Sequence, residues 1–526
     1  MKKPKFLLSI NGQTGMLMCL GLLIVTLFGA TIRLYPALIS SFPLFDGGLF
    51  YIMAQDLQAS HLSLPLYTSY NGGQIPFVYP PLGLYLLVIV AGVFQAPLLT
   101  LMRLLPPLMS ILTIPAFFFL SQTLLKHKGA AFIATCAFAV LPPAFDWLTL
   151  GGSITRTPGF LFALLALNQL ALLYQCFYKR NLILAVVFSS LAVYSHPAMA
   201  WFVLYSSLVF FVLSKPNLKK FSLSLVVAGY VGLLTAPWWV TLVIRFGVQP
   251  LLNALHVGSG SFSGWTFFPP FLFLFTNEPL LDLLAVLGLL GLLVALRERK
   301  FLLVAWFFVV FIAQTKESAI MASIPFAMFI GLGIGNLVLP GLGGMSSNEV
   351  FSPNWQPSLP QGLFLVYVIV LGLTSAFTVA GSMKPIPQED IKAMEWIQLN
   401  TPLKSRFAVL VGNASSSLAV SEWFPALSQR VSVNTGEGME WLSVEPGKTD
   451  FDTFTRLQTC TLQSLSCVEE WSRQTGLAWD YLYIPLQTVT LADGSPSKLL
   501  TSLQSSPYYA LIFQNASTLV FHRLEP

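Results

Sequence analysis

The sequence predicts a polytopic α-helical membrane protein that ends in a smaller α/β domain. Hydrophobic residues make up 55% of the 526 residues and charged residues only 10%. One water-soluble core cannot bury so many apolar side chains. The apolar residues lie in long runs, but from about residue 384 onward the chain is less apolar and alternates between helix-like and strand-like stretches. We therefore expect a membrane domain over residues 1–383 and an α/β domain over residues 384–526.

Eleven apolar runs are interpreted as membrane-spanning helices. The first covers about residues 15–34, and it lacks a small-residue cleavage site and is too long for a signal-peptide core, so we expect it to remain in the protein. The other ten begin near residues 99, 130, 158, 182, 198, 223, 280, 301, 319 and 363.

The basic residues orient these spans. If eleven spans alternate, the clusters at 126–128, 179–180, 215–220 and 297–300 all fall on one side, which the positive-inside rule makes the cytoplasm. The N-terminus then lies in the cytoplasm and the α/β domain outside, in a protein of the cytoplasmic membrane. The formal net charge of +6 comes from these loop clusters rather than from one basic stripe, so we expect no nucleic-acid partner.

Two shorter apolar runs are not counted as spans. A full span at residues 82–94 would put three basic clusters on the outer side, so we interpret this run as lying in or dipping into the outer interface. The alternative stays open that residues 82–94 form a short tilted span and that a second additional span restores the sidedness of the loops. The same question applies to residues 267–275.

The α/β domain is expected to alternate helices and strands, ending in a hairpin that turns at Asn515. Helices are predicted over 390–399, 417–427, 452–474 and 498–505, and strands over 407–411, 431–433, 481–484, 509–513 and 518–522. Of the five cysteines, only Cys460 and Cys467 form a possible pair, because the other three lie in apolar runs.

Asp46 is the strongest candidate for chemistry. It follows the first span and precedes Gly47 and Gly48, in an outer loop that covers residues 35–97. A carboxylate beside the bilayer is costly to desolvate and usually has a function, although an Asp before two glycines can also be a turn residue that caps the following backbone. We favour the functional interpretation because the glycines leave space beside the carboxylate.

The first outer loop resembles that of the GT-C superfamily of membrane glycosyltransferases, which includes dolichyl-phosphate-mannose protein mannosyltransferases and lipid A aminoarabinose transferases. The resemblance rests on Asp46 as the acidic motif after the first helix and on Pro80-Pro81-Leu82 as the later element. It implies a GT-C-like fold and transfer of a sugar from a polyprenyl-phosphate donor, with inversion, to a glycan, protein or lipid acceptor on the outer side. Asp46 would be the general base. Many relatives carry a second acidic residue where this chain has Gly47.

Other outer-face residues are candidates for binding. Arg156, in a glycine-rich turn, is suited to hold the donor phosphate, and Arg245 is a weaker candidate for the same role. Snorkelling toward lipid headgroups is the structural alternative for both. His196, Tyr79 and Asn71 are candidates to contact substrate.

The sequence does not decide whether the protein binds a divalent metal. Asp46, Asp56 and His61 are residue types that bind such ions, but their spacing matches no specific metal motif. For Asp56 and His61 we favour local roles in the loop. Lys316 and Glu317 are expected to form a local ion pair.

Aromatic residues on the outer side have two interpretations. Trp238, Trp239, Trp265, Phe267 and Phe268 fit an interfacial belt, and the same rings can stack on a sugar or a prenyl chain. In the α/β domain, residues 423–425 and 436–441 form either a saccharide-contacting surface or core and turns.

Two alternatives to a transferase remain at this stage. A lipid-carrier transporter or flippase would share the many spans, but no internal repeat is evident. A non-catalytic scaffold for envelope assembly would explain Gly47 as a lost carboxylate.

Overall fold

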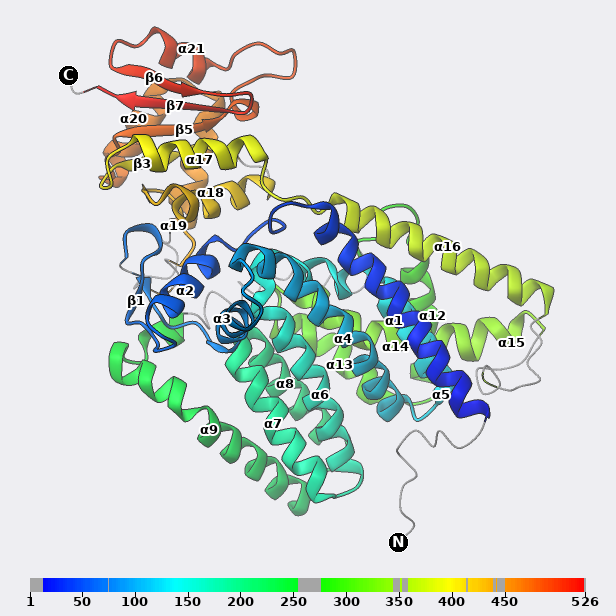
Figure 1. The fold of residues 1–526 in the computed structure, drawn as a ribbon. Coiled ribbons are helices and arrows are strands. Elements are labelled where there is room, and N and C mark those ends of the chain that lie inside the picture. The colour runs from blue at the N-terminus through cyan, green and yellow to red at the C-terminus, as the bar shows by residue number, and fades with distance from the viewer. Residues whose placement is uncertain are drawn as a thin grey trace.

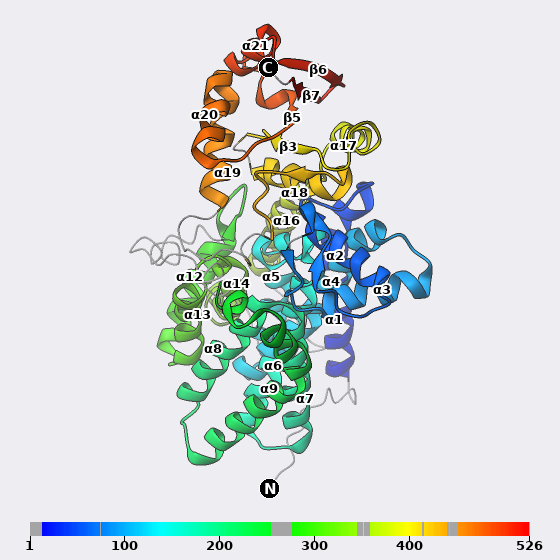
Figure 2. The same cartoon turned by 90° about the vertical axis from the view of Figure 1, so that its left-hand side faces the viewer.

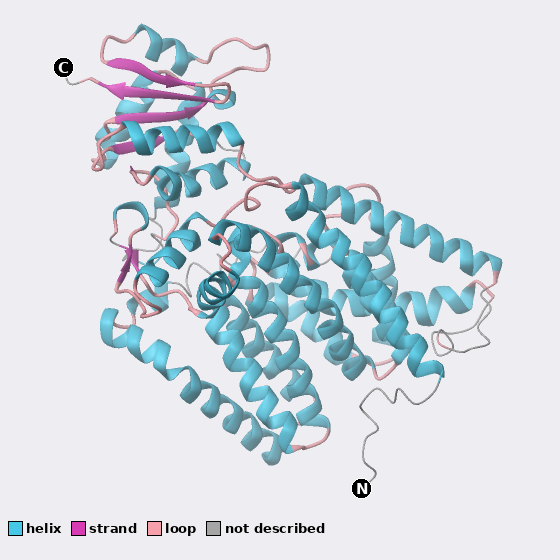
Figure 3. Ribbon diagram, viewed as in Figure 1, coloured by secondary structure: helices cyan, strands magenta, loops and turns pink. Residues whose placement is uncertain are grey.

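The protein is mostly helical, with a small sheet at its C-terminal end (Figures 1 and 3). The computed structural model describes residues 13–73, 75–253, 276–343, 351, 358–412, 415–438, 441 and 450–524. The predicted run at 267–275, with Trp265, lies outside the described residues, as do Met439 and Glu440.

Each of the eleven predicted spans corresponds to a helix. These helices are α1 (Gln13–Ile39), α4 (Leu98–Leu125), α5 (Lys128–Val140), α6 (Arg156–Gln175), α7 (Lys179–Ser195), α8 (Pro197–Leu213), α9 (Leu218–Phe246), α12 (Leu283–Arg297), α13 (Phe301–Ala313), α14 (Ser318–Gly333) and α16 (Leu359–Ser382).

Fewer than eleven of these helices are long and apolar enough to be complete membrane spans. Among the described residues, six helices are long and apolar enough to cross a membrane: α1, α4, α6, α9, α16 and the segment Ser318–Gly341 that contains α14. A seventh results if α5 and the segment Pro142–Leu148, bent by 88°, count as one span. The chain is thus an integral multi-pass membrane protein, while eleven spans and the orientation of the termini stay predictions.

The first loop folds into short elements between the helices and the sheet. It contains α2 (Gly48–Ala59), β1 (Tyr67–Thr68), β2 (Ile75–Pro76) and α3 (Leu82–Phe94), and β1 pairs antiparallel with β2. The run at 82–94 is therefore a helix of 13 residues. At 1.5 Å per residue it is about 20 Å long, less than the roughly 30 Å of a bilayer core.

The C-terminal α/β region, which we define as Gln388 to Arg523, is a five-stranded sheet with helices on both faces (Figure 2). The strand order is β4-β3-β5-β7-β6, in which β3 runs parallel to β4 and β5, and β7 runs antiparallel to β5 and β6. The strands are β3 (Arg406–Val409), β4 (Val431–Ser432), β5 (Tyr481–Pro485), β6 (Tyr509–Gln514) and β7 (Thr518–Arg523), and the helices are α17 (Gln388–Asn400), α18 (Ser415–Ser428), α19 (Asp450–Thr459), α20 (Leu465–Thr475) and α21 (Lys498–Ser505).

One predicted helix of this region is wrong. Residues 452–474 form two helices, α19 and α20, and a disulfide joins Cys460 to Cys467 across the break between them. Periodicity alone does not show this break, since both halves are amphipathic. The predicted hairpin is present as β6 and β7.

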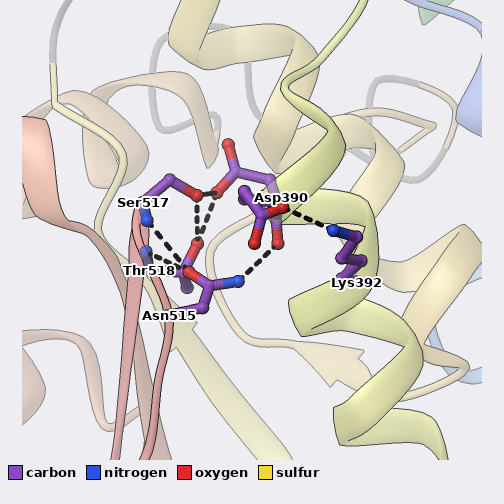
Figure 4. A network of polar contacts seen from close by, with 6 residues as sticks. Asp390, Lys392, Asn515, Ser517 and Thr518 are labelled. Carbon is purple, nitrogen blue, oxygen red and sulfur yellow. Dashed lines mark hydrogen bonds and ion pairs between the residues drawn. The ribbon is translucent and has the colours of Figure 1, made fainter.

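The start of α17 is held on the hairpin turn by a polar network (Figure 4). Asp390 is 1% exposed, and its Oδ1 accepts hydrogen bonds from Tyr483, Ser517 and Thr518. The side chain of Asn515 donates to the Glu389 carbonyl at 2.8 Å. The network ties the region's first helix to its last strands.

The first loop and the α/β region share one hydrophobic core. Phe42, Met53 and Phe77 of the loop pack in the same buried cluster as Trp423 and Phe424 of α18. A second cluster fills the helical bundle, where Phe117 and Phe138 stack with centroids 4.2 Å apart. Because burial of large apolar side chains dominates such contacts, the loop that carries Asp46 is packed between bundle and sheet.

Candidate active site

Asp46 lies between α1 and α2 and is half-buried. Its Oδ1 accepts a hydrogen bond of 2.9 Å from the backbone N–H of Gly152, a residue of the turn that precedes α6. A Cβ added at Gly152 would lie 2.7 Å from the Asp46 carboxyl carbon. A side chain at that position would therefore collide with the carboxylate, so the glycine is required for this approach.

Asp46 does not cap α2, because Glu422 of α18 takes that role. The Glu422 Oε1 accepts from the N–H groups of Gly47 at 3.0 Å and Leu49 at 3.3 Å. A carboxylate at a helix N-terminus satisfies free N–H groups and complements the helix dipole. The capping role that the turn interpretation gave to Asp46 thus belongs to Glu422. The Asp46 carboxylate instead faces Gly152.

Further contacts hold the α/β region against the loop around Asp46. Trp423 donates its indole N–H to the Phe45 carbonyl at 2.9 Å, and Tyr70 donates its hydroxyl to the Glu422 carbonyl at 2.7 Å. Asn71 pairs with the backbone of Ser432, accepting at 2.7 Å and donating at 3.1 Å. These bonds fix the backbone on both sides of Asp46.

Arg156 is the first residue of α6, and its charge interacts with that of Asp46. Its Nη2 is 3.3 Å from Glu317 Oε1, and its guanidinium lies 5.8 Å from the centre of the Trp147 ring. The negative charge of Asp46 also acts on it. The Arg156 Nε is buried and has no hydrogen-bond partner among the described residues. Such a group is suited to receive an anion.

His196 and Tyr79 lie beside this pair. The centre of the His196 ring is 5.8 Å from the centre of the Tyr79 ring. The charges of Glu317 and Arg156 act on His196 in opposite directions, because Glu317 raises its pKa and Arg156 lowers it. Burial lowers the pKa of His196 to about 4, so the ring is neutral at pH 7. Its Nδ1 accepts from the Ala198 N–H at 3.2 Å, which places the proton of the neutral ring on Nε2.

Burial raises the pKa of Asp46 above its usual range, and the nearby charge of Arg156 and the hydrogen bond from Gly152 oppose that rise. A carboxylate with a raised pKa is a stronger base than an exposed one. The site therefore combines a basic carboxylate, a guanidinium and a neutral imidazole.

An apolar groove of about 500 Å³ opens next to these residues. It runs between α6, α7, α8 and α9, and its end near the site is lined by Val78, Pro80, Pro197 and Trp441. Figure 1 shows α9 as the outermost helix on this side of the bundle. Leu170, Val193, Leu204, Val227 and Val231 line the groove farther along.

Three of the predicted site residues have other partners. Arg245 donates to the carbonyls of Leu64 and Pro65, and no described contact joins it to Asp46 or Arg156. Asn71 holds Ser432, as described above. Asp56 accepts from Thr68 and Ser69 and closes the loop locally.

A metal site does not form from the three candidates. Among the described residues, no group of three or more His, Cys, Asp or Glu side chains is arranged to hold a metal ion. His61 is exposed at the end of α2. In the part of the chain that the structure describes, Asp46, Asp56 and His61 do not come together as one set of ligands, and we derive no step through a metal.

Sequence reasoning missed Glu317 and Glu422 as residues of this site. Glu317 was expected to pair locally, whereas the structure makes it a partner of Arg156. Glu422 is 375 residues from Gly47 in sequence, and an acidic residue in an amphipathic helix carries no signal of such a contact. Trp147 had a weak signal, because it follows Asp146 in the outer turn that ends at Arg156.

The Glu422 cap gives a prediction about the loop. Glu422→Ala should destabilise the start of α2 by about 1–2 kcal/mol, as for other lost N-caps, and speed amide hydrogen exchange over residues 44–59. Glu422→Gln keeps an acceptor oxygen and should change exchange much less. Glu395→Ala, at an exposed position of α17, is the control. Unchanged exchange in Glu422→Ala would show that the cap does not hold the loop.

Comparison with known proteins identifies the fold. No protein-family model matches the sequence, and no curated protein matches it. Solved structures do match. The oligosaccharyltransferase AglB from Archaeoglobus fulgidus aligns with a TM-score of 0.58 and 13% identity, over 90% of this chain and 70% of that one. ArnT from Cupriavidus metallidurans aligns with a TM-score of 0.54 and 14% identity, over 95% and 96%.

A third similar structure is the arabinofuranosyltransferase AftD from Mycobacteria, with a TM-score of 0.56 and 15% identity. The alignment covers 96% of this chain and 41% of AftD. AglB, ArnT and AftD are GT-C glycosyltransferases, and this chain has the GT-C fold. The fold predicted from the first loop is thus confirmed.

Proposed function

We propose that this protein is an integral membrane glycosyltransferase that moves a sugar from a polyprenyl-phosphate donor to an extracytoplasmic acceptor. The observation that carries the proposal is the joint placement of the Asp46 carboxylate and the Arg156 guanidinium close to Tyr79 and His196, whose neighbours Pro80 and Pro197 line an apolar groove. A base and a phosphate-binding cation beside a lipid-sized groove are the parts that this reaction needs.

The groove would hold the prenyl chain of the donor, and Arg156 would hold its phosphate. Apolar walls favour a hydrocarbon chain because they remove it from water. Arg156 has a buried Nε that is available to a phosphate oxygen. Structures of two proteins with this fold support the assignment, since AglB is solved with a dolichol-phosphate and ArnT with undecaprenyl phosphate.

The reaction would be one displacement with inversion at the anomeric carbon. Asp46 takes the proton of the acceptor hydroxyl, whose oxygen forms a bond to the anomeric carbon. The bond between that carbon and the phosphate oxygen breaks, and the phosphate leaves with the electron pair. Arg156 stabilises the charge that grows on it, while the neutral His196 and Tyr79 can donate hydrogen bonds to the sugar or phosphate.

The sidedness follows the sequence prediction, with the N-terminus in the cytoplasm and the C-terminal α/β region outside. The disulfide between Cys460 and Cys467 supports this placement, because disulfides persist mainly in oxidising compartments. The acceptor would therefore be met on the outer face, where the α/β region packs over Asp46.

The test is transfer by the purified protein in lipid. Radiolabelled polyprenyl-phosphate sugars are supplied with crude envelope acceptors, and the released polyprenyl phosphate and labelled product are counted. We expect both to appear. Movement of intact donor across the bilayer without bond cleavage would support the transporter alternative, and neither cleavage nor movement would support the scaffold.

Gly152→Ala tests the position of Asp46 without changing a charged group. The added methyl would overlap the carboxylate, and a displacement near 1 Å can cost about a hundredfold in rate. We expect the turnover number to fall by about that factor. Gly229→Ala is the control, since nothing lies within 4 Å of a Cβ there. Equal activity of the two variants would mean that the observed Asp46 position is not the reactive one.

The pH dependence tests the raised pKa of Asp46. A general base must be ionised, so the rate falls as pH drops through its pKa. Because burial raises that pKa, the acid limb of kcat/KM should lie above about 4, the usual value for Asp. A profile over pH 4–9 measures it. An acid limb at or below the usual value would contradict the assignment.

A further inference from the structure

A second cavity, of about 480 Å³, lies where the C-terminal α/β region meets the chain beside Asp46. Phe45, Asp146 and Trp147 line it from the bundle side, and Val411 and Gln487 line it from the sheet. Lys384, in the segment between α16 and α17, lines it as well. Its volume is in the range of about 300–1,000 Å³ that is common for small-molecule sites.

The cavity meets the sheet at its topological switch point. From β3 the chain passes through α18 to β4 on one side, and then through α19 and α20 to β5 on the other side of β3. The carboxyl ends of β3 and β5 therefore diverge into loops on opposite faces, which leaves a crevice where ligands bind in open α/β sheets. Val411 follows β3, and Gln487 follows β5.

The lining is polar and aromatic at its rim and apolar at its floor. Lys384 and Gln487 are exposed, and Trp147 is 44% exposed. The buried Val411 and Val420 form part of the floor. Carboxylate, amide and ammonium groups match sugar hydroxyls, and an exposed indole face packs on the C–H face of a sugar ring.

Asp146 can accept a hydroxyl in this cavity. One of its oxygens accepts from the Trp147 N–H at 2.7 Å, and its side chain also contacts that of Asn277. A carboxyl group keeps further acceptor positions in either charge state, and the protonated form also donates. These two contacts therefore leave it able to bind a ligand hydroxyl.

Two residues of the cavity lining adjoin the reacting groups. Phe45 lines it and directly precedes Asp46, and Trp147 lines it while its ring lies over the Arg156 guanidinium. The apolar groove reaches the same groups through Pro80 and Pro197, which flank Tyr79 and His196. The residues around Asp46 and Arg156 thus adjoin an apolar groove on one side and a more polar cavity on the other.

We propose that this cavity binds the acceptor and that the acceptor is a carbohydrate. The proposal rests on the proposed function and names the class of its second substrate. A sugar ring on Trp147, held by Asp146 and Gln487, would present a hydroxyl toward Asp46. A peptide is less well matched, because peptides commonly pair with an exposed strand edge, whereas the strands that reach this cavity are the central β3 and the inner β5.

The experiment measures acceptor and donor parameters separately, with the full chain in lipid nanodiscs. The acceptor probes are defined gluco-, manno-, galacto- and arabino-oligosaccharides, and a mixed peptide library is the competing class. We expect an oligosaccharide to be glycosylated. Gln487→Ala and Asp146→Ala should each raise the KM for that acceptor about fivefold to tenfold, as expected for one lost hydrogen bond. The donor KM should be unchanged in Gln487→Ala, which is the variant used for that comparison because the charge of Asp146 also acts on Arg156.

Matched variants separate the cavity from general damage. Gln474→Ala removes an exposed amide on α20, whose partner is Glu470, and should change neither KM. Trp147→Ala should raise both, because Trp147 contacts the cavity and Arg156. Direct binding of the oligosaccharide without donor, followed by tryptophan fluorescence, should weaken in Gln487→Ala by the same factor.

The outcomes distinguish this inference from the proposed function. Donor cleavage with transfer only to peptides, or to no oligosaccharide in the panel, would overturn the carbohydrate acceptor and leave the transferase in place. An unchanged acceptor KM in both Gln487→Ala and Asp146→Ala would overturn the cavity assignment. Oligosaccharide binding without any donor cleavage would support the cavity and contradict the proposed function.

Discussion

Asp46→Asn should reduce glycosyl transfer by about a hundredfold or more, which is the effect of losing a general base. The amide keeps the size of the side chain and an oxygen that can accept from the Gly152 N–H, as Asp46 Oδ1 does at 2.9 Å. It cannot take a proton from a hydroxyl. The loss should therefore appear in the turnover number rather than in the KM for the donor, measured with radiolabelled donor in lipid.

The control for this variant is Asp56→Asn on the same loop. Asp56 lies on α2, and its oxygens accept from Thr68 and Ser69, so we expect a change of less than about fivefold from such a local contact. A comparable loss in both variants would indicate that the loop, rather than the Asp46 carboxylate, limits the rate. Full activity of Asp46→Asn would remove Asp46 from the chemistry.

Arg156→Gln should lower the turnover number by about 10² to 10³, as seen when a group that stabilises transition-state charge is removed. The leaving phosphate would lose its cation, and the half-buried Glu317 would lose the partner that lies 3.3 Å away. Arg156→Lys keeps the charge but not the planar pair of donors. It should retain more activity than Arg156→Gln, by about tenfold.

Two further variants separate the roles of Arg156. Glu317→Gln removes the ion pair but leaves the guanidinium, so its loss of rate should be smaller than that of Arg156→Gln. Arg473→Gln breaks an exposed pair with Glu470 on α20 and should have no effect on transfer. If Glu317→Gln were as damaging as Arg156→Gln, Arg156 would act by holding the fold rather than the phosphate.

Sequence periodicity predicted the elements of this protein well, because helices and strands depend on local patterns. Each of the eleven apolar runs is helical, and the hairpin at Asn515 is present. Span number was harder, since hydropathy does not set helix length: α13 has 13 residues and α8 has 17. The break between α19 and α20 was missed because no proline or glycine marks it in the sequence; a disulfide spans it in the structure.

The site was predictable only in its parts. Asp46 and Arg156 each stood out through a carboxylate or guanidinium beside glycines at the membrane face. Their association depends on the bond from Gly152 to Asp46, across 106 residues, and on the packing of the turn before α6 against the first loop. The positions of Glu317, Glu422 and Gln487 beside the candidate site depend on tertiary contacts that no local pattern encodes.

The most direct test of the central claim is a single-turnover measurement with excess protein and a labelled polyprenyl-phosphate sugar. Polyprenyl phosphate and glycosylated acceptor should appear in equal amounts and at the same rate, with the anomeric configuration inverted. Asp46→Asn should abolish both together. A product that retains the anomeric configuration would contradict a single displacement, and donor that stays intact while it crosses the bilayer would contradict a transferase.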